Sequence, residues 1–98
     1  MSLTAKQRQY LKGLAHQRKP VVMLGNAGLT PAVLAEIEQA LERHELLKVR
    51  LPAVERAERG VMVGEIGEKT GAETVQEIGR VVVLYRRAGK PRIELPAR

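Results

Sequence analysis

A short apolar run followed by a glycine loop and a helix start constrains the fold of this chain more than any other feature. Residues 21–24 are four apolar side chains between Pro20 and Gly25. A run bounded in this way is typical of a strand that is covered on both faces. Thr30 is a good helix N-cap, and Pro31 suits the first helical position because no backbone N–H is needed there. The sequence therefore predicts a buried strand, a tight loop and a helix.

The loop between this strand and this helix offers a place for a phosphate. Gly25 and Gly28 allow a sharp turn and leave no Cβ in the way of a ligand. The helix that follows contributes free N–H groups and partial positive charge. A lone GxxG pattern also fits a turn that simply requires glycine, so its role depends on the rest of the chain. Arg18 and Lys19 lie at the other end of the strand, and the fold decides whether they reach the same ligand.

Basic residues are concentrated toward the two ends of the chain. Residues 1–35 hold five Lys or Arg and no acid, residues 36–77 hold six against ten Glu, and residues 78–98 hold six against one. If the two ends meet in the fold, they form a positive face that favours a polyanion. A basic surface without a partner is the alternative, and the net charge of +6 with a pI near 10.2 disfavours it.

A length of 98 residues predicts one domain over residues 1–98. The expected elements are a helix over 5–16, a strand over 21–24, a helix over 31–44, a strand over 46–51, a helix over 55–70, strands over 72–77 and 80–86, and an extended, partly mobile tail over about 88–98. Two helical crossovers should each give parallel neighbours, and a final hairpin should give an antiparallel pair. We therefore predict an α/β fold of order α-β-α-β-α-β-β with a mixed four-stranded sheet.

The predicted helices carry three positional expectations. Tyr10 falls on the apolar face of the first helix and is assigned to the core. The glycines at 60, 64 and 67 fall at helical spacing, which would suit one face packed closely against a neighbour. Gly71 is expected to end the third helix as its C-terminal cap.

The predicted strands carry three further expectations. Lys48 and Arg50 alternate with apolar residues, so the outward side of their strand should be basic. The run 81–84 is apolar on both sides, which indicates a central strand with the first helix covering its second face. A tight turn at residues 78–79 should join the last two strands.

The chain offers no catalytic constellation. It has no Cys and no Asp. His16 and His44 each lie near a predicted helix C-terminus, where a donor or cation suits the last carbonyls. No nucleophile–base pair can be assembled, and neither a metal nor a cofactor is expected. Two Tyr and no Phe or Trp are too few to stack single-stranded bases, so binding would rest on phosphate contacts and shape.

Five segments together resemble a known family. The segments 3–8, 19–22, 25–30, 45–50 and 78–86 look like a stand-alone bacterial CRM domain of the YhbY type, in the same order and spacing. The resemblance implies an RNA-binding domain with a fold similar to the C-terminal domain of bacterial translation initiation factor three. It also implies a glycine loop at Gly25, Asn26, Ala27 and Gly28 and a basic surface at Arg18, Lys19, Lys48, Arg50, Arg80 and Arg86. Because Asn26 and Ala27 are uncharged, phosphate contact in the loop would use backbone N–H groups.

The resemblance and the charge together favour a non-enzymatic RNA-binding protein. We expect it to be a cytoplasmic monomer that acts on structured ribosomal RNA in large-subunit precursors, with no membrane and no small-molecule substrate as partner. An architectural protein for double-stranded DNA is one alternative. A nucleotide-handling enzyme that uses the same loop is another.

Overall fold

A computed structural model describes residues 2–19 and 21–97. The elements are α1 (Ala5–His16), β1 (Val22–Met23), α2 (Pro31–His44), β2 (Leu46–Arg50), α3 (Arg56–Thr70), β3 (Glu73–Ile78) and β4 (Val81–Tyr85). This is the predicted α-β-α-β-α-β-β order. No helix in these two ranges combines the length and the apolar character that a membrane crossing needs.

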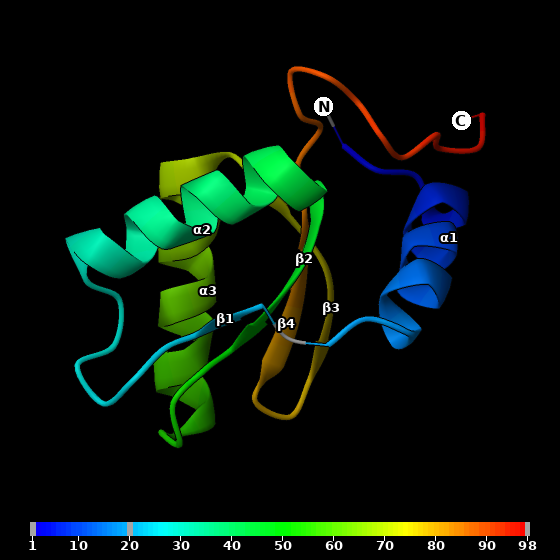
Figure 1. Cartoon of the computed structure of the whole chain (residues 1–98). Coiled ribbons are helices and arrows are strands. Elements are labelled where there is room, and N and C mark those ends of the chain that lie inside the picture. Colours follow the sequence, from blue (N-terminus) through cyan, green and yellow to red (C-terminus); the bar gives the residue numbers. More distant parts are fainter. Residues whose placement is uncertain (1, 20, 98) are drawn as a thin grey trace.

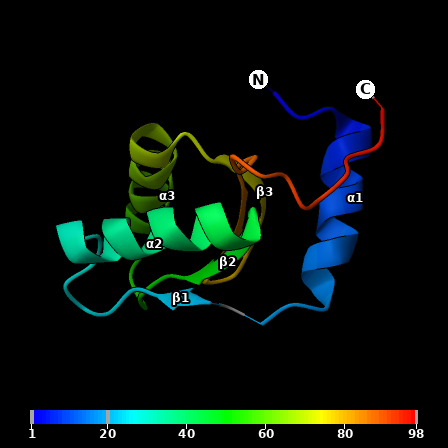
Figure 2. The same cartoon turned by 45° about the horizontal axis from the view of Figure 1, so that its top comes forward.

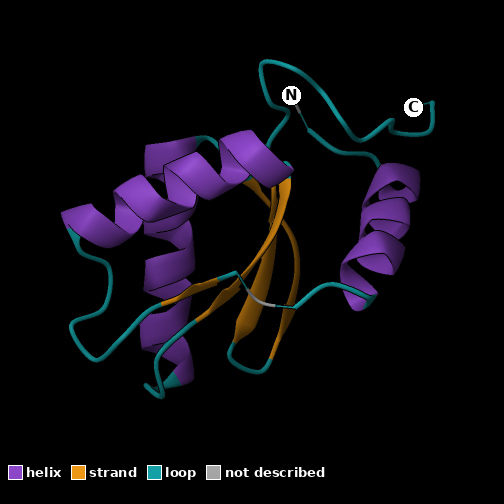
Figure 3. Ribbon diagram, in the orientation of Figure 1, coloured by secondary structure: helices purple, strands orange, loops and turns teal. Residues whose placement is uncertain are grey.

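The four strands form one mixed sheet in the order β1-β2-β4-β3. β1 runs parallel to β2, whereas β4 is antiparallel to both of its neighbours. Helices α2 and α3 cover one face and α1 covers the other, as Figure 1 and Figure 3 show. The core accordingly has two parts: one lies under α2 and α3, and a smaller one lies under α1. The predicted mixed four-stranded sheet with β4 at its centre is confirmed. The second expected pair of parallel neighbours is wrong, because β4 lies between β2 and β3 and is antiparallel to both.

The helices begin and end close to the residues predicted from their capping motifs. The Gln7 N–H donates to Thr4 Oγ1 and the Thr4 N–H donates to Gln7 Oε1, both at 3.1 Å, which completes a capping box at the start of α1. Thr30 accepts from the Val33 N–H at 3.2 Å at the start of α2. Gly71 caps α3 in the left-handed conformation, with φ of 74°. Each signal acts within a few residues, so each could be predicted from the sequence.

The prediction of a β1 strand covered on both faces is wrong. β1 has only two residues and lies at the edge of the sheet. Val22 is buried against α2 and α3, but Val21 and Met23 are 50% and 62% exposed on the other face. Helix α1 packs over β2, β4 and β3 on that face and leaves β1 open. Pro20, the expected boundary of this strand, lies outside the described residues.

Two helix expectations need correction. Tyr10 is 42% exposed and is not a core residue, because α1 buries the narrower stripe Gln7, Leu11 and Ala15. Gly60 and Gly64 have no neighbouring atoms where a Cβ would lie, so they do not mark a closely packed face. The inner side of α3 is instead formed by Ile66, with Met62 packed beside it.

The strand boundaries near the last hairpin are shifted by one residue. The predicted turn at 78–79 is wrong: Ile78 still pairs with Val81, and the turn consists of Gly79 and Arg80. Gly79 has φ of 57°, a conformation that a two-residue hairpin turn requires and that glycine adopts without strain. The shift moves Arg80 from the strand into the turn.

The tail has no helix or strand but is fastened to the domain. Ile93 and Leu95 pack against the smaller core cluster. The Gln7 side-chain amide donates to the Pro96 carbonyl at 3.1 Å. Figure 2 shows the tail passing alongside α1. The tail therefore helps to cover the same sheet face as α1.

Candidate nucleic-acid interface

The glycine loop is exposed and presents unpaired backbone donors. Gly25, Asn26 and Ala27 are exposed, whereas Gly28 is buried. The Gly28 N–H donates to the Gly25 carbonyl at 2.9 Å and closes the turn. Within the described part of the chain, the N–H groups of Gly25, Asn26 and Ala27 have no protein acceptor. Three backbone donors without partners on an exposed turn suit an anion.

Gly28 is required by the geometry of this turn. Its φ is 74°, and a Cβ added there would meet Met62 Cε at 3.4 Å. A side chain at this position would therefore strain the backbone and press against α3. Gly25 has open space around it and no positive φ.

Two of the predicted cations lie at the same end of the sheet as the loop. The Leu24 N–H donates to the Arg50 carbonyl at 2.9 Å, which places Arg50 beside the start of the loop. The Leu51 N–H donates to the Arg80 carbonyl and Arg80 Nε donates to the Leu51 carbonyl, at 2.6 and 3.2 Å. Arg50 and Arg80 are both exposed. The ends of β1 and β2 and the β3–β4 turn thus place both residues beside one another.

The other predicted cations on this side lie at the opposite end of β1. The Val21 N–H donates to the Lys48 carbonyl at 3.1 Å. The Lys48 ammonium donates to the Arg18 carbonyl, and Arg18 Nη1 donates to the Leu46 carbonyl at 3.1 Å. Lys19 follows Arg18 and is exposed. These contacts place the α1–β1 connection against β2.

Lys48 and Arg50 join the two groups. They are two residues apart on β2 and so face the same side of the sheet. That side is the open face of β1, where Met23 pairs with Arg50. We call the set Arg18, Lys19, Lys48, Arg50 and Arg80 the cationic track, because it follows β1 and β2 from the α1–β1 connection to the glycine loop.

Arg86 is not part of the track. Its guanidinium bonds Glu38 at 2.9 Å and Glu42 at 3.4 Å on α2. It also donates to the Thr70 carbonyl at the end of α3, at 2.8 Å. The side chain is 22% exposed and links three elements. This environment differs from that of the other five predicted cations.

Sequence analysis missed Glu45, the buried carboxylate that fastens the tail. Glu45 has no exposed surface, and its φ is 62°, unusual for a residue other than glycine. Its carboxylate accepts the N–H groups of Ala88, Arg92 and Ile93 at 3.0, 2.5 and 2.7 Å. These partners lie more than 40 residues away in the sequence, so no local pattern indicates them.

The pKa of Glu45 is the result of two opposed effects. Burial raises the pKa, but the three backbone hydrogen bonds and the charge of Arg92 outweigh burial and hold the pKa below its ordinary value. Burial also raises the pKa of the neighbouring Tyr85, and the negative charge of Glu45 adds to that rise while Arg87 opposes it. Glu45 is therefore ionised in the folded domain at neutral pH.

Because folding lowers the pKa of Glu45, the sign of the pH dependence of stability follows. A carboxyl with a lowered folded pKa contributes stability that is fully present above its unfolded pKa of about 4.3 and lost as pH falls through the folded value. We expect the unfolding free energy of the wild type to exceed that of Glu45→Gln at pH 7, and the difference to shrink below about pH 4. Urea unfolding of both proteins between pH 3 and pH 7 measures this. A difference that is independent of pH would contradict it.

Among residues 2–19 and 21–97, no three His or Glu side chains converge in a way that could hold an ion. The donors that the surface offers are backbone N–H, guanidinium and ammonium groups, all of which suit phosphate oxygens.

The fold and this surface define a small α/β domain with a glycine loop and a cationic face. The chain belongs to the CRS1/YhbY (CRM) domain family, whose model matches residues 3–86. It is 50% identical over 95 residues to an RNA-binding protein of Haemophilus influenzae, covering 97% of this chain and 96% of that one. It is 30% identical over 95 residues to the probable RNA-binding protein YqeI of Bacillus subtilis, covering 96% and 99%. The solution structure of the hypothetical protein SAV1595 from Staphylococcus aureus matches with a TM-score of 0.84 at 34% identity, covering 97% of this chain and all of that one.

Proposed function

We propose that this chain is a non-enzymatic RNA-binding protein that acts as a monomer on structured ribosomal RNA in large-subunit precursors in the cytoplasm. RNA as the partner is supported by the family and by the names of the relatives. The ribosomal assignment rests on the resemblance of the sequence to the YhbY type.

One observation carries the proposal: an exposed loop with unpaired N–H groups continues into a track of cations that lack carboxylate partners. The ion pairs in the described part of the chain involve only Lys69 and Arg86 as cations. Among the described residues, no carboxylate therefore competes with a phosphate for the five cations of the track, although Arg18, Lys48 and Arg80 each donate one hydrogen bond to a backbone carbonyl. Phosphate contacts fix the position of a nucleic acid without reading its bases, so recognition would depend on the shape of the RNA.

A competition experiment tests the partner class. Fragments of large-subunit ribosomal RNA, small-subunit ribosomal RNA and duplex DNA compete for the protein at one fixed salt concentration, because salt alone changes such affinities strongly. We expect the large-subunit fragments to compete most strongly for the protein. Equal competition by duplex DNA would favour the architectural alternative. Sedimentation of cell extract should place the protein with large-subunit precursors.

The loop has its own prediction. Asn26→Asp adds one negative charge at an exposed position and barely changes the side-chain volume. We expect RNA affinity to fall about five- to tenfold, because the new carboxylate would repel a phosphate bound by the loop N–H groups. Asn26→Ala removes the amide without adding charge and should change affinity less than twofold. Filter binding at fixed salt measures both, and equal affinities for the two variants would remove the loop from the interface.

A further inference from the structure

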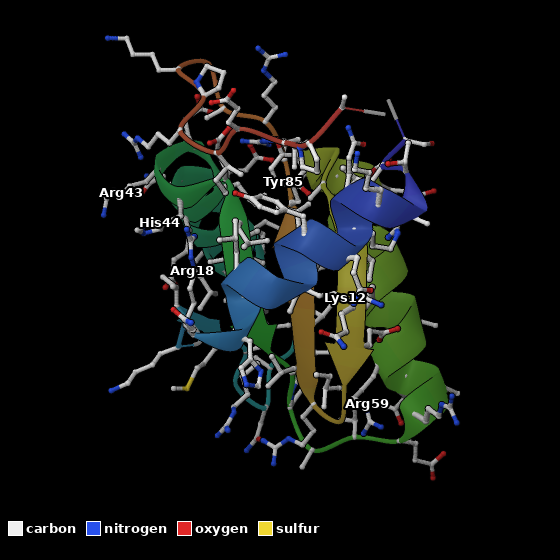
Figure 4. All side chains as sticks on the ribbon, turned by 90° about the vertical axis from the view of Figure 1, so that its right-hand side faces the viewer. Lys12, Arg18, Arg43, His44, Arg59 and Tyr85 are labelled. Carbon is white, nitrogen blue, oxygen red and sulfur yellow. The ribbon has the colours of Figure 1, made fainter. Side chains whose placement is uncertain are left out.

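A second cationic feature lies at the α1–β1 end of the track, with which it shares Arg18, Lys19 and Lys48, and sequence analysis did not predict it. It is a hollow of about 680 Å³ between the α1–β1 connection, the last turn of α2, β2 and the tail. Its polar lining consists of six basic side chains and no acidic one: Arg18, Lys19, Arg43, His44, Lys48 and Arg92. Figure 4 shows Arg43, His44 and Arg18 along one edge of the molecule, with Lys12 and Arg59 elsewhere. We call it the basic pocket.

The positive charge of the basic pocket is balanced by the protein only in small part. None of its Arg or Lys side chains forms an ion pair within the part of the chain that the structure describes. The buried carboxylate of Glu45 interacts electrostatically with Arg92 alone among them. Glu45 lies between His44 and Leu46, but it is fully buried and its carboxylate is occupied by three N–H groups of the tail. A concave surface with charge of one sign concentrates counter-ions of the other sign.

The end of helix α2 explains only part of this arrangement. Arg43 and His44 occupy the last turn, where a cation is favoured by the helix dipole. That effect does not explain why Arg18, Lys19 and Arg92 converge on the same hollow from the α1–β1 connection and the tail. Bringing five formal charges together costs free energy, which an anionic ligand would recover.

The pocket and the glycine loop lie at opposite ends of β1. Val21 lines the pocket and Leu24 precedes the loop, so about 10 Å of strand separates them. In double-stranded DNA each strand carries one phosphate about every 3.4 Å along the helix axis. By that spacing a few phosphates of one strand can span the two features, with Lys48 at the pocket end and Arg50 toward the loop.

We propose that the basic pocket binds RNA phosphate at a point where phosphates crowd, such as a sharp backbone turn or a strand end carrying a terminal phosphate. Five charges in a hollow suit more than one phosphate charge. The proposal rests on the proposed function, since RNA is the source of the phosphate. It adds Arg43, His44 and Arg92 to the interface and sets the direction in which RNA crosses the domain.

The experiment removes two pocket charges and compares a matched control. Arg43→Gln with Arg92→Gln should weaken binding to a large-subunit RNA fragment about tenfold and lower the salt slope by about two. The control, Lys6→Gln with Lys69→Gln, makes the same charge change on exposed helix positions away from the pocket and should weaken binding less than threefold. Circular dichroism checks that both variants fold. Equal losses in the two double variants would overturn the proposal.

Binding of inorganic tripolyphosphate tests the pocket proposal independently of the proposed RNA-binding function. Calorimetry should show binding to the wild type and to the control Lys6→Gln/Lys69→Gln but much weaker binding to Arg43→Gln/Arg92→Gln. If tripolyphosphate binds in this way but ribosomal RNA does not bind, the proposed function fails and the pocket remains a phosphate site. If RNA binds equally well to the wild type and the pocket variant, the pocket proposal fails and the function stands.

RNAs with a 5′-phosphate and a 5′-hydroxyl distinguish the two sources of phosphate. Preference of the wild type for the 5′-phosphate, lost in the pocket variant, would identify a strand end. Equal binding of both RNAs by the wild type, with both weakened in the pocket variant, would identify an internal turn.

Discussion

Glu45→Ala is expected to destabilise the domain by about 3–5 kcal/mol, the largest effect that we predict for a single substitution. The substitution removes the acceptor of three backbone N–H groups of the tail. A buried donor left without a partner costs about 1–3 kcal/mol, and the tail limits the total because it can detach and be solvated. Detachment would also expose the apolar surface under Ile93 and Leu95. Urea unfolding at pH 7 measures the loss.

Glu42→Ala is the matched control for this prediction. Glu42 lies less than one helical turn before Glu45, is exposed, and accepts one tail N–H, that of Gly89, at 2.9 Å. We expect its loss to cost less than about 1 kcal/mol, as for other exposed groups. Hydrogen exchange should show faster exchange at Ala88, Arg92 and Ile93 in Glu45→Ala but not in Glu42→Ala. Similar unfolding free energies for both variants would contradict the role of Glu45.

Replacing Glu45 by glycine separates the effect of the lost hydrogen bonds from the effect of backbone strain. Glu45 has φ of 62° and ψ of −45°, which only glycine adopts readily. Glu45→Gly loses the same three hydrogen bonds as Glu45→Ala but relieves this strain. It should therefore be about 1 kcal/mol more stable than Glu45→Ala. The wild-type glutamate keeps the strained conformation because its carboxylate is bonded to the tail.

Elements with local causes could be predicted from the sequence. The capping pairs of α1 and α2 and the glycine cap of α3 act between residues three or four positions apart. The apolar run of β4 indicates a strand buried on both faces, and β4 is indeed central. The similar run at residues 21–24 led to the wrong prediction that β1 is buried on both faces. A continuous apolar run does not show whether a strand is central or at the edge of the sheet. The antiparallel pairing of β2 with β4 leaves β1 at the edge.

The candidate site could be predicted only in part, for the same reason. The glycine loop and its helix start are local, and Arg50 and Arg80 come near it because strand ends meet at one edge of the sheet. The basic pocket depends on the end of α2 meeting the α1–β1 connection and the tail, which no sequence spacing specifies. Glu45, which fastens that tail, carries no sequence signal of its own. Long-range contacts therefore determine the part of the surface that sequence analysis missed.

Arg86 lies in segment 78–86, which resembles the CRM family, but its contacts stabilise the fold. Its guanidinium contacts two glutamates on α2 and the last carbonyl of α3, and it follows directly after β4. These contacts tie α2 and α3 to the central strand. Contact with RNA would instead require Arg86 to leave these partners, and the carbonyl of the buried Thr70 would lose its donor.

Arg86→Met is expected to destabilise the domain by about 2 kcal/mol while leaving RNA affinity within twofold of the wild type. Methionine keeps much of the apolar stem, so the loss reports the hydrogen bonds and ion pairs rather than packing. Arg87→Met, at the exposed neighbouring position, removes the same charge and should change stability by less than about 0.5 kcal/mol. Chemical unfolding and filter binding at one salt concentration measure the two quantities for both variants. A loss of RNA affinity in Arg86→Met that exceeds the loss in Arg87→Met, without a loss of stability, would return Arg86 to the interface. The expected result assigns Arg86 to the fold, because an interface residue changes binding and a linking residue changes unfolding.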